Sequence, residues 1–230
     1  MSGSYCYRYP HPAVTTDIVV LTIFDECLHA LLIERGSPPF RGSWALPGGF
    51  LEPDEDLDNC AARELEEETG LSGVSLEQIQ AFSRPDRDPR ERVVSVAYLA
   101  LIAPPQARVR AASDAARAAW HPLDELPPLA FDHADIIAVV RQRLRGRPDH
   151  SRYVFELLPD TFTIGELHRA YELLLSEPRD QRRFRNWALS GRLIEYSGAD
   201  RHCDPHPPMR LYRARRPRRP SDPGRTGATP

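Results

Sequence analysis

The sequence GFLEPDEDLDNCAARELEEETGL, residues 49–71, decides the fold class of this chain. Glu64, Glu67 and Glu68 stand three and four positions apart, so on a helix their side chains project from one face, while Glu66 points the opposite way. Three convergent carboxylates suit a hard cation such as Mg²⁺ or Mn²⁺, which prefers several oxygen ligands and keeps some of its water. The stretch therefore predicts a metal-binding helix whose open coordination positions take phosphate oxygens and an attacking water.

Capping signals set the expected limits of this helix. Asp54 is placed to cap its first turn, and Gly70 stands where a left-handed residue ends a helix, which predicts a helix from about Glu55 to Thr69. Just before the helix, Gly48 and Gly49 allow the backbone to approach it closely, and both are expected to contact the substrate.

Arg63 lies beside the acidic face of the helix. It is expected to orient Glu67 or Glu64 through charge-assisted hydrogen bonds, so these three residues form the expected catalytic group. The alternative is an exposed acidic helix, in which each like-charge pair costs only about 0.2 to 0.5 kcal/mol. Partly buried carboxylates would instead repel one another by about 3 kcal/mol per pair and would require a cation. The complete spacing favours the metal site.

Apolar patterns on both sides of this helix predict a sheet. A turn at Asp25-Glu26 separates the first two expected strands, which begin the sheet as a hairpin. The expected strands are residues 18–24, 28–33, 74–82, 93–102 and 118–121, and a further helix is expected over residues 132–144. Strands and helices in this order predict an α/β sandwich.

The formal net charge of −3 conceals two halves of opposite sign. Residues 1–140 hold 11 Arg and 22 Asp or Glu, whereas residues 141–230 hold 19 Arg and 11 Asp or Glu. An acidic half suits divalent cations, and an arginine-rich half suits polyanions such as nucleic acid. The polar stretch RGRPDHSR, residues 145–152, has the character of a linker, so a second, smaller domain is expected from near Tyr153.

Cysteine spacing and hydropathy indicate a cytoplasmic protein. The four cysteines show no paired spacing, and the first residues lack a charged start followed by an apolar run. No stretch approaches the roughly 20 apolar residues needed to cross a bilayer, so no membrane partner is expected.

The second half contains the signals of a winged helix-turn-helix. Thr163-Ile-Gly-Glu166 is a capping box that starts a helix to about Leu175, with Phe162 and Leu167 as its hydrophobic staple. Pro178 is expected to open the next helix. Strands of a wing are expected at residues 193–196 and 210–213.

The second of these helices is expected to lie in the major groove of double-stranded DNA. Its apolar residues Phe184, Trp187 and Leu189 are spaced to face inward, while arginines, Arg179 included, surround them. The expected DNA-binding residues are Arg182, Arg183 and Arg185 on the helix and Arg201 in the wing. The alternative is a solvated basic helix in a protein-binding module.

Residues 49–71 resemble the Nudix box at every specified position. From about residue 13 to 213 the chain also resembles the Nudix-related transcriptional regulators of NAD metabolism, the NrtR family. The stretches that support this resemblance are WALPGG (44–49), DRDPR (86–90), FDH (131–133), residues 155–173 and Phe184-Arg185. The resemblance implies a Nudix α/β/α sandwich with a mixed sheet, a small winged helix-turn-helix domain, and ADP-ribose as the ligand of the first domain. Family regulators often have an eroded box, so the intact box favours retained hydrolysis.

These features define three expected parts of the chain. They are a Nudix domain at residues 1–147, a winged-helix DNA-binding domain at 148–213, and a disordered basic Pro-rich tail at 214–230. The tail has almost no apolar residues with which to offset the entropy of ordering.

Loop arginines are the expected phosphate ligands of the first domain. The expected substrate-binding residues are Gly48, Gly49, Arg41, Arg84, Arg87 and Arg90, with Arg92 as a further candidate. Asp86, Asp88 or Glu91 is able to supply a base, although a solvated loop charge is an open alternative for each. Phe40 is able to stack on a nucleobase, and Trp44 is expected in the core. Three histidines without paired metal spacing, His29, His121 and His133, are expected to be structural or surface residues.

The leading hypothesis is a bifunctional protein. A Mg²⁺-dependent hydrolase of ADP-ribose or a related nucleoside diphosphate derivative is fused to a DNA-binding domain, and ligand shifts a homodimer between states of different DNA affinity. Two alternatives stay open: a non-catalytic ADP-ribose-sensing repressor, and a housekeeping Nudix hydrolase whose C-terminal domain serves assembly. Turnover and salt-dependent DNA binding are the properties that separate them.

Overall fold

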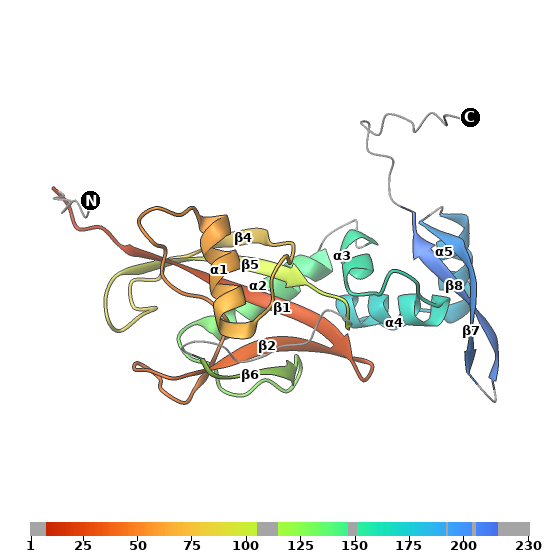
Figure 1. Cartoon of the computed structure of the whole chain (residues 1–230), viewed down its shortest axis with the longest axis horizontal. Helices are drawn as coiled ribbons and strands as arrows, with labels where there is room; N and C mark the ends of the chain where they lie inside the picture. Colours follow the sequence, from red (N-terminus) through yellow and green to blue (C-terminus); the bar gives the residue numbers. More distant parts are fainter. Residues whose placement is uncertain (1–7, 105–114, 147–150, 192, 204–205, 216–230) are drawn as a thin grey trace, which may run out of the picture.

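The computed structural model describes residues 8–104, 115–146, 151–191, 193–203 and 206–215, which fold into two parts (Figure 1). A mixed sheet with helices α1 and α2 forms the part nearer the N-terminus, and three further helices with a two-stranded ribbon form the other. This architecture confirms the predicted α/β sandwich followed by a small winged helix.

Six strands in the described part of the chain form the first sheet. They are β1 Ala13–Phe24, β2 Cys27–Arg35, β3 Trp44–Ala45, β4 Glu77–Phe82, β5 Val93–Leu101 and β6 Ala115–Pro122. Their order is β3-β2-β1-β5-β4, and β6 also pairs with β2. Only β1 and β5 run parallel, so the sheet is mixed.

Alternation along β1 divides the core between the two faces of the sheet. Ile18 and Val20 pack in one apolar cluster with α1 (Leu57–Thr69), whereas Val19 and Leu21 pack in another with α2 (His133–Gly146). Both faces of the central strand are therefore buried, with one helix on each side. The result is a three-layer α/β/α sandwich.

The carboxylate helix α1 begins later than predicted. Its N-cap is Asp56 instead of Asp54, and the Asp56 carboxylate accepts a hydrogen bond from the Asn59 backbone N–H at 2.9 Å. Glu55 consequently lies before the helix and keeps its side chain for other contacts. The predicted end is confirmed, since Gly70 has a left-handed φ of 72° and its N–H donates to a carbonyl of the last turn.

Other boundaries differ from the sequence prediction for local reasons. β1 begins at Ala13 because it pairs with β5 from its first residue, and β3 has only two residues, too few for a periodic pattern. The expected linker at 145–152 is shorter than predicted, because α2 continues to Gly146 and α3 begins at Ser151. β4 begins at Glu77, not at residue 74.

The second part has the order of elements expected for a winged helix. Its elements are α3 Ser151–Glu156, α4 Ile164–Leu175, α5 Gln181–Ser190, β7 Ile194–Cys203 and β8 His206–Ala214. The capping box of Thr163 and Glu166 is confirmed at the start of α4, and Phe162 and Leu167 are both buried. The wing strands are longer than predicted.

Helix α5 corrects two predictions. Asp180 caps it, so neither Pro178 nor Arg179 belongs to the helix. Phe184 and Ala188 are its buried residues. Leu189 is 44% exposed instead of facing inward, whereas Trp187 is 42% exposed but still packs against Tyr171 and Phe184. The ten-residue helix is held by a narrow apolar stripe, and most of its surface is open.

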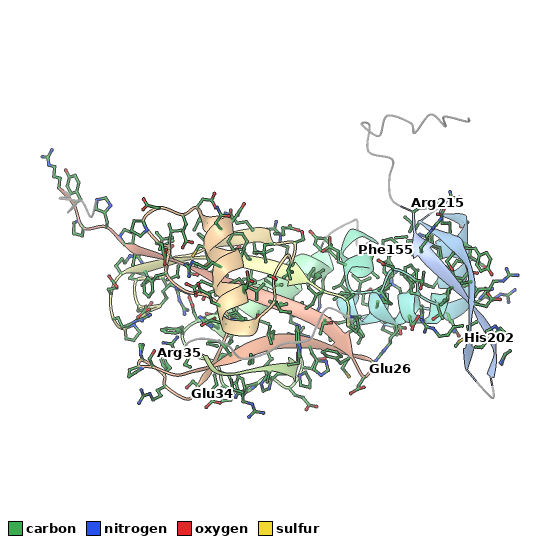
Figure 2. All side chains as sticks on the ribbon, in the orientation of Figure 1. Glu26, Glu34, Arg35, Phe155, His202 and Arg215 are labelled. Atoms are coloured by element: carbon green, nitrogen blue, oxygen red, sulfur yellow. The ribbon has the colours of Figure 1, made fainter. Side chains whose placement is uncertain are left out.

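The two parts share one apolar core. The cluster that contains Val19 and α2 continues through α3 and α4 to Phe184. At the tip of the β1–β2 hairpin, the Glu26 carbonyl accepts a hydrogen bond from Arg169 of α4 at 2.8 Å, and Figure 2 labels Glu26 where the hairpin meets the second part. The hairpin and α4 are thus in direct contact.

No helix in the described residues is long and apolar enough to cross a membrane. The predicted tail lies outside the described residues from 216 onward, and Ala214 is the last residue of β8.

Candidate functional site

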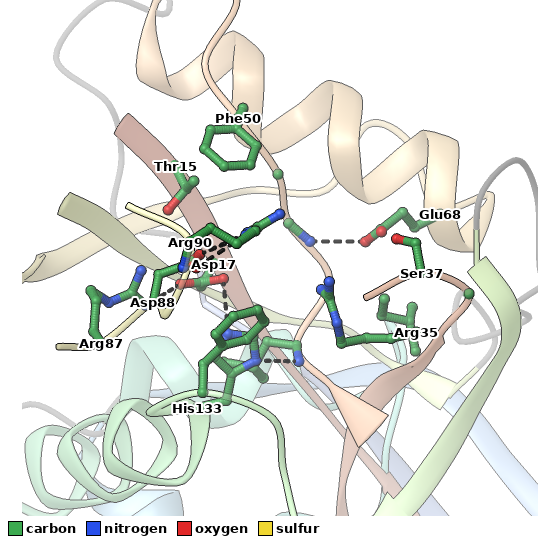
Figure 3. Close-up of a pocket in the computed structure, with 16 residues that line it drawn as sticks. Thr15, Asp17, Arg35, Ser37, Phe50, Glu68, Arg87, Asp88, Arg90 and His133 are labelled. Atoms are coloured by element: carbon green, nitrogen blue, oxygen red, sulfur yellow. Dashed lines mark hydrogen bonds and ion pairs between the residues drawn. The ribbon is translucent and has the colours of Figure 1, made fainter. Parts of the chain in front are cut away.

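A cavity of about 240 Å³ opens beside the sheet and is bordered by residues 46–50, the glycine loop (Figure 3). It is lined by Thr15, Asp17, Ile33, Arg35, Gly36, Ser37, Leu46, Gly48, Gly49, Phe50, Glu68, Arg87, Asp88, Arg90, Phe131 and His133. The lining combines acidic, basic and aromatic side chains from β1, β2, α1, the start of α2 and four connecting loops. Such a mixed, concave site suits a small polar ligand.

Glu68 brings the carboxylate helix into this cavity. Its Oε2 accepts a hydrogen bond from the Gly48 N–H at 2.9 Å, which fixes the carboxylate against the glycine loop (Figure 3). Burial, with a further contribution from Glu64, raises the pKa of Glu68 to about 8, despite the Gly48 bond and Arg35, which act in the opposite direction. Burial also raises the pKa of Glu64. A bound cation would relieve the cost of ionising both groups.

The two glycines are required by close approach. A Cβ on Gly49 would overlap the Glu64 carboxylate, and a Cβ on Gly48 would overlap the Thr16 carbonyl oxygen. Any side chain here would push the loop away from α1. The predicted role of the glycines in close packing against the helix is therefore met, and both line the cavity.

Arg63 joins the acidic residues of this face. Its guanidinium contacts Glu55 at 2.6 Å, Glu64 at 2.8 Å and Glu67 at 3.2 Å, so it does orient the two carboxylates as expected. The bonds from Arg63 lower the pKa of Glu55 to about 2. In the described ranges, no three His, Cys, Asp or Glu side chains are arranged as a metal cluster. Nη1 of Arg63 contacts both Glu64 and Glu67 and so lies between these two carboxylates.

Arg90 is a fixed part of the cavity wall. Asp88 receives two of its N–H groups, at 3.0 and 2.7 Å, and its guanidinium lies over the rings of Phe50 and Phe131 at 5.1 and 5.8 Å. Burial raises the pKa of Asp88, but the bonds from Arg90 outweigh this and lower it. Asp88 therefore acts as the anion that positions Arg90, which makes it a poor general base.

Arg35 was not predicted, and it is the least neutralised cation of the cavity. It lies over the Phe131 ring at 4.8 Å, and its Nε donates to the Pro39 carbonyl at 2.9 Å. Burial and then the charge of Arg90 lower its pKa, which Glu68, Asp88 and Asp17 partly offset. Two guanidinium groups on one phenyl ring favour an anionic ligand between them. The sequence offers no signal for Arg35, because it stands at the end of a strand like any edge charge.

Arg87 is one of the predicted residues that line the cavity. Its side chain is only 4% exposed and pairs with Asp132 at 2.7 Å and Asp17 at 3.0 Å. Asp17 also accepts from Ser95 and faces His133 Nε2 at 3.3 Å. Arg87 therefore lines the cavity as predicted for a ligand-binding residue, but its guanidinium is paired with two protein carboxylates.

His133 belongs to this network of buried side chains, in agreement with its predicted structural role. Its Nδ1 accepts the Leu46 backbone N–H at 2.9 Å, so Nε2 carries the proton that faces Asp17. Burial raises the pKa of Asp17, but His133, Arg87 and Ser95 lower it well below its ordinary range. The network holds the start of α2 against β1 and the glycine loop.

The remaining predicted loop residues lie apart from the cavity lining. Arg41 donates to the Gly36 carbonyl at 2.7 Å, and Arg84 forms an exposed pair with Asp135 at 3.3 Å. Neither lines the cavity. Arg92 donates to backbone carbonyls of its own loop. Phe40 is 45% exposed and meets the edge of Phe131, whereas Trp44 packs against His121.

A second candidate site is the outer surface of α5. Arg182, Arg183 and Arg185 are all exposed there. Among the residues that the structure describes, none of their guanidinium groups has an ion-pair or hydrogen-bond partner, and α5 itself carries no acidic residue. Arg201 differs, because it pairs with Glu166 of the capping box at 2.6 Å.

Comparisons with known proteins match both parts of the chain. The NUDIX domain model matches residues 13–140, and the model of the NrtR DNA-binding winged helix domain matches residues 154–214. The ADPR responsive transcriptional repressor NtrR of Acinetobacter baylyi is 33% identical over 209 residues, covering 89% of this chain and 83% of that protein.

Two further relatives match one or both parts. The ADP-ribose pyrophosphatase of Methanocaldococcus jannaschii is 40% identical over 132 residues, which cover 57% of this chain and 75% of that protein. The crystal structure of Shewanella oneidensis NrtR complexed with a 27mer DNA has a TM-score of 0.73 and 32% identity, and the match covers 88% of this chain and 93% of that one.

Proposed function

Since the chain belongs to the Nudix family and, within it, to the NrtR regulators, we propose that it is an ADP-ribose-responsive DNA-binding regulator that has kept Nudix hydrolase activity. The observation that carries this proposal is the meeting of Glu68 from the carboxylate helix with Arg35 and Arg90 in one cavity. Acidic and basic groups that converge in this way suit a diphosphate held together with a cation.

Glu64, Glu67 and Glu68 are the residues that would hold Mg²⁺ or Mn²⁺. The fit rests on the donor set, because Glu64 and Glu68 are costly to ionise without a cation, and carboxylates are ligands that these ions prefer. When bound, the ion offsets charge on the diphosphate and acidifies a water. Arg63 would have to give up its contacts with Glu64 and Glu67 while keeping Glu55.

The protein's own side chains divide the remaining work. Arg35 and Arg90 bind the phosphates, and the Phe50 and Phe131 rings exclude water from one side of the ligand. Glu64 or Glu67 accepts the proton of the attacking water, and Arg63 stays beside them through its pair with Glu55. Cleavage of the ADP-ribose diphosphate by water then gives AMP and ribose 5-phosphate.

The winged helix supplies the regulatory half of the proposal. Helix α5 would enter the major groove of double-stranded DNA with Arg182, Arg183 and Arg185, while the wing contacts the backbone. The shared core and the contact of Arg169 with the β1–β2 hairpin give the cavity a physical connection to this domain. In a homodimer, ligand would select between arrangements of different DNA affinity.

A second candidate is a sensor that binds ADP-ribose without cleaving it. The observation in its favour is the position of Arg63 between Glu64 and Glu67, where a guanidinium takes the contacts that a cation needs. The third reading, a housekeeping hydrolase with an assembly domain, is disfavoured by the unpaired arginines of α5.

An assay of the full-length protein separates the candidates. Purified protein with Mg²⁺ and ADP-ribose is followed for AMP release, next to Glu67→Gln and to Glu66→Gln, an exposed control on the opposite face of α1. We expect turnover by the wild type and the control but not by Glu67→Gln. Binding of ADP-ribose without turnover would favour the sensor, and the absence of both would refute the proposed function.

A further inference from the structure

Helix α5 exposes a row of side chains to solvent on the side directly opposite its buried residues. This row is called the outer stripe. Phe184 and Ala188 are buried, and the opposite side includes Arg182, Asn186 and Leu189, at positions i, i+4 and i+7, with Ser190 beside Asn186 at the end of the helix. Asn186 stands at the centre of this outer stripe. Figure 1 shows α5 at the end of the second part that lies away from the Nudix sheet.

Arg183 and Arg185 flank this stripe on its two sides. With 100° between successive residues, one lies about 60° to one side of Asn186 and the other about 100° to the opposite side. A helix in the major groove has a sugar–phosphate backbone on each side and base edges in front of it. In such a groove the flanking arginines would therefore face the sugar–phosphate backbones, and Asn186 would face the base edges.

The arginine of the outer stripe, Arg182, has no carboxylate partner among the described residues, in contrast to three arginines of the wing strands and the residue after them. Arg201 pairs with Glu166, and Arg213 and Arg215 both pair with Glu195. The Asn186 amide, by comparison, has no hydrogen-bond partner within the described residues. Its donor and acceptor both remain available to a ligand.

We propose that Asn186 reads an A·T base pair in the major groove, with Leu189 against the methyl group of a thymine. An Asn amide forms two hydrogen bonds with adenine, one to N7 and one from N6, and this pattern is not offered by the other bases. Leu189 is 44% exposed and stands one turn after Asn186, where the apolar surface available in the groove is the thymine methyl. This inference rests on the DNA-binding part of the proposed function.

Selection from a random duplex library tests the proposal with the full-length protein. Wild type, Asn186→Ala and Gln181→Ala are compared, because Gln181 is an exposed amide on the same helix but off the stripe. We expect wild type and Gln181→Ala to select the same site. Asn186→Ala should lose its preference for adenine at one position of each half-site by roughly 5- to 150-fold, and keep the others.

Modified bases then locate the contact. At that position, 7-deazaadenine should weaken wild type and leave Asn186→Ala unchanged, and at the neighbouring thymine, deoxyuridine should weaken wild type but not Leu189→Ala. If wild type selects a site and Asn186→Ala selects the identical one, the readout by Asn186 is overturned while the proposed function stands. If wild type selects no sequence at all, the DNA-binding part of the proposed function fails with it.

Discussion

The cavity of the Nudix domain and the outer surface of α5 use arginine in opposite ways. In and around the cavity, Arg63 binds three carboxylates, Arg87 binds two and Arg90 binds one. On α5, the exposed arginines form no ion pair with a carboxylate of the described residues. The first arrangement holds side chains in place for a small ligand, and the second leaves charge available for a large polyanion.

The comparison implies different consequences of mutation in the two regions. Removing a paired, buried arginine leaves carboxylates uncompensated, which costs folding free energy. Removing an unpaired, exposed arginine leaves the free energy of unfolding unchanged and lowers only the affinity for DNA. The following predictions test this division.

The largest effect is expected at Arg87. Arg87→Met leaves Asp17 and Asp132 buried without their cation and should lower the free energy of unfolding by about 3–5 kcal/mol. Arg84→Met is the matched control, because its pair with Asp135 is more than half exposed on both sides and contributes about 0–1 kcal/mol. Urea unfolding measures both. Equal losses of unfolding free energy in the two variants would show that burial does not determine how much an ion pair contributes to stability.

Next in size is the effect of Glu68→Gln on catalysis. The amide can still accept the Gly48 N–H, so the fold should be kept, but a metal ligand is lost and kcat should fall by about 10²- to 10³-fold. Because Glu68 is costly to ionise in the metal-free protein, its stability without Mg²⁺ at pH 8 should not decrease. A variant with normal kcat would refute the metal assignment.

A smaller effect is expected on α5. Arg183→Ala should weaken DNA binding by about tenfold on every sequence and lower the slope of log K against log salt by about 1, with stability unchanged. Arg213→Ala, whose guanidinium already pairs with Glu195, is the control and should change DNA affinity less. Affinities are measured by fluorescence anisotropy over a salt series. A larger loss of DNA affinity for Arg213→Ala than for Arg183→Ala would show that ion pairing within the protein does not decide which arginines bind DNA.

The smallest effect is the acid dependence of stability that comes from Asp17. Its folded pKa lies below the unfolded value of 3.8, so its contribution is fully present above pH 3.8 and is lost as pH falls from there through the folded pKa. One group gives a slope of at most about 1.4 kcal/mol per pH unit. Asp17→Asn should flatten the decline of unfolding free energy below pH 4. The exposed Asp135→Asn should leave the slope unchanged.

The sequence predicted the elements better than the side-chain partners. The spacing of Glu64, Glu67 and Glu68 and the capping box at Thr163 depend on residues close together in the chain, and both helices formed as expected. The partners of Arg87 were not predicted, because Asp17 and Asp132 lie far from it in the sequence.

The exposed residues of α5 show a second limit of the sequence prediction, which concerns burial. Trp187 and Leu189 are apolar and fit a helical period, so the pattern predicted that both face inward. The short helix buries only Phe184 and Ala188, and Trp187 contacts Tyr171 of α4 with one part of its ring while the rest stays exposed. Arg35 was missed for a related reason: the cavity that it faces is formed only by tertiary packing.

The central claim is that a nucleotide in the cavity changes DNA binding by α5 through the shared core. Its most direct test is the DNA affinity of the full-length protein, with Mg²⁺, in the absence and presence of a methylene-bridged ADP-ribose analogue that cannot be cleaved. We expect a shift of about 5- to 150-fold, and DNA should shift the affinity for the analogue by the same factor. An analogue that binds the protein but leaves DNA affinity unchanged would contradict the account.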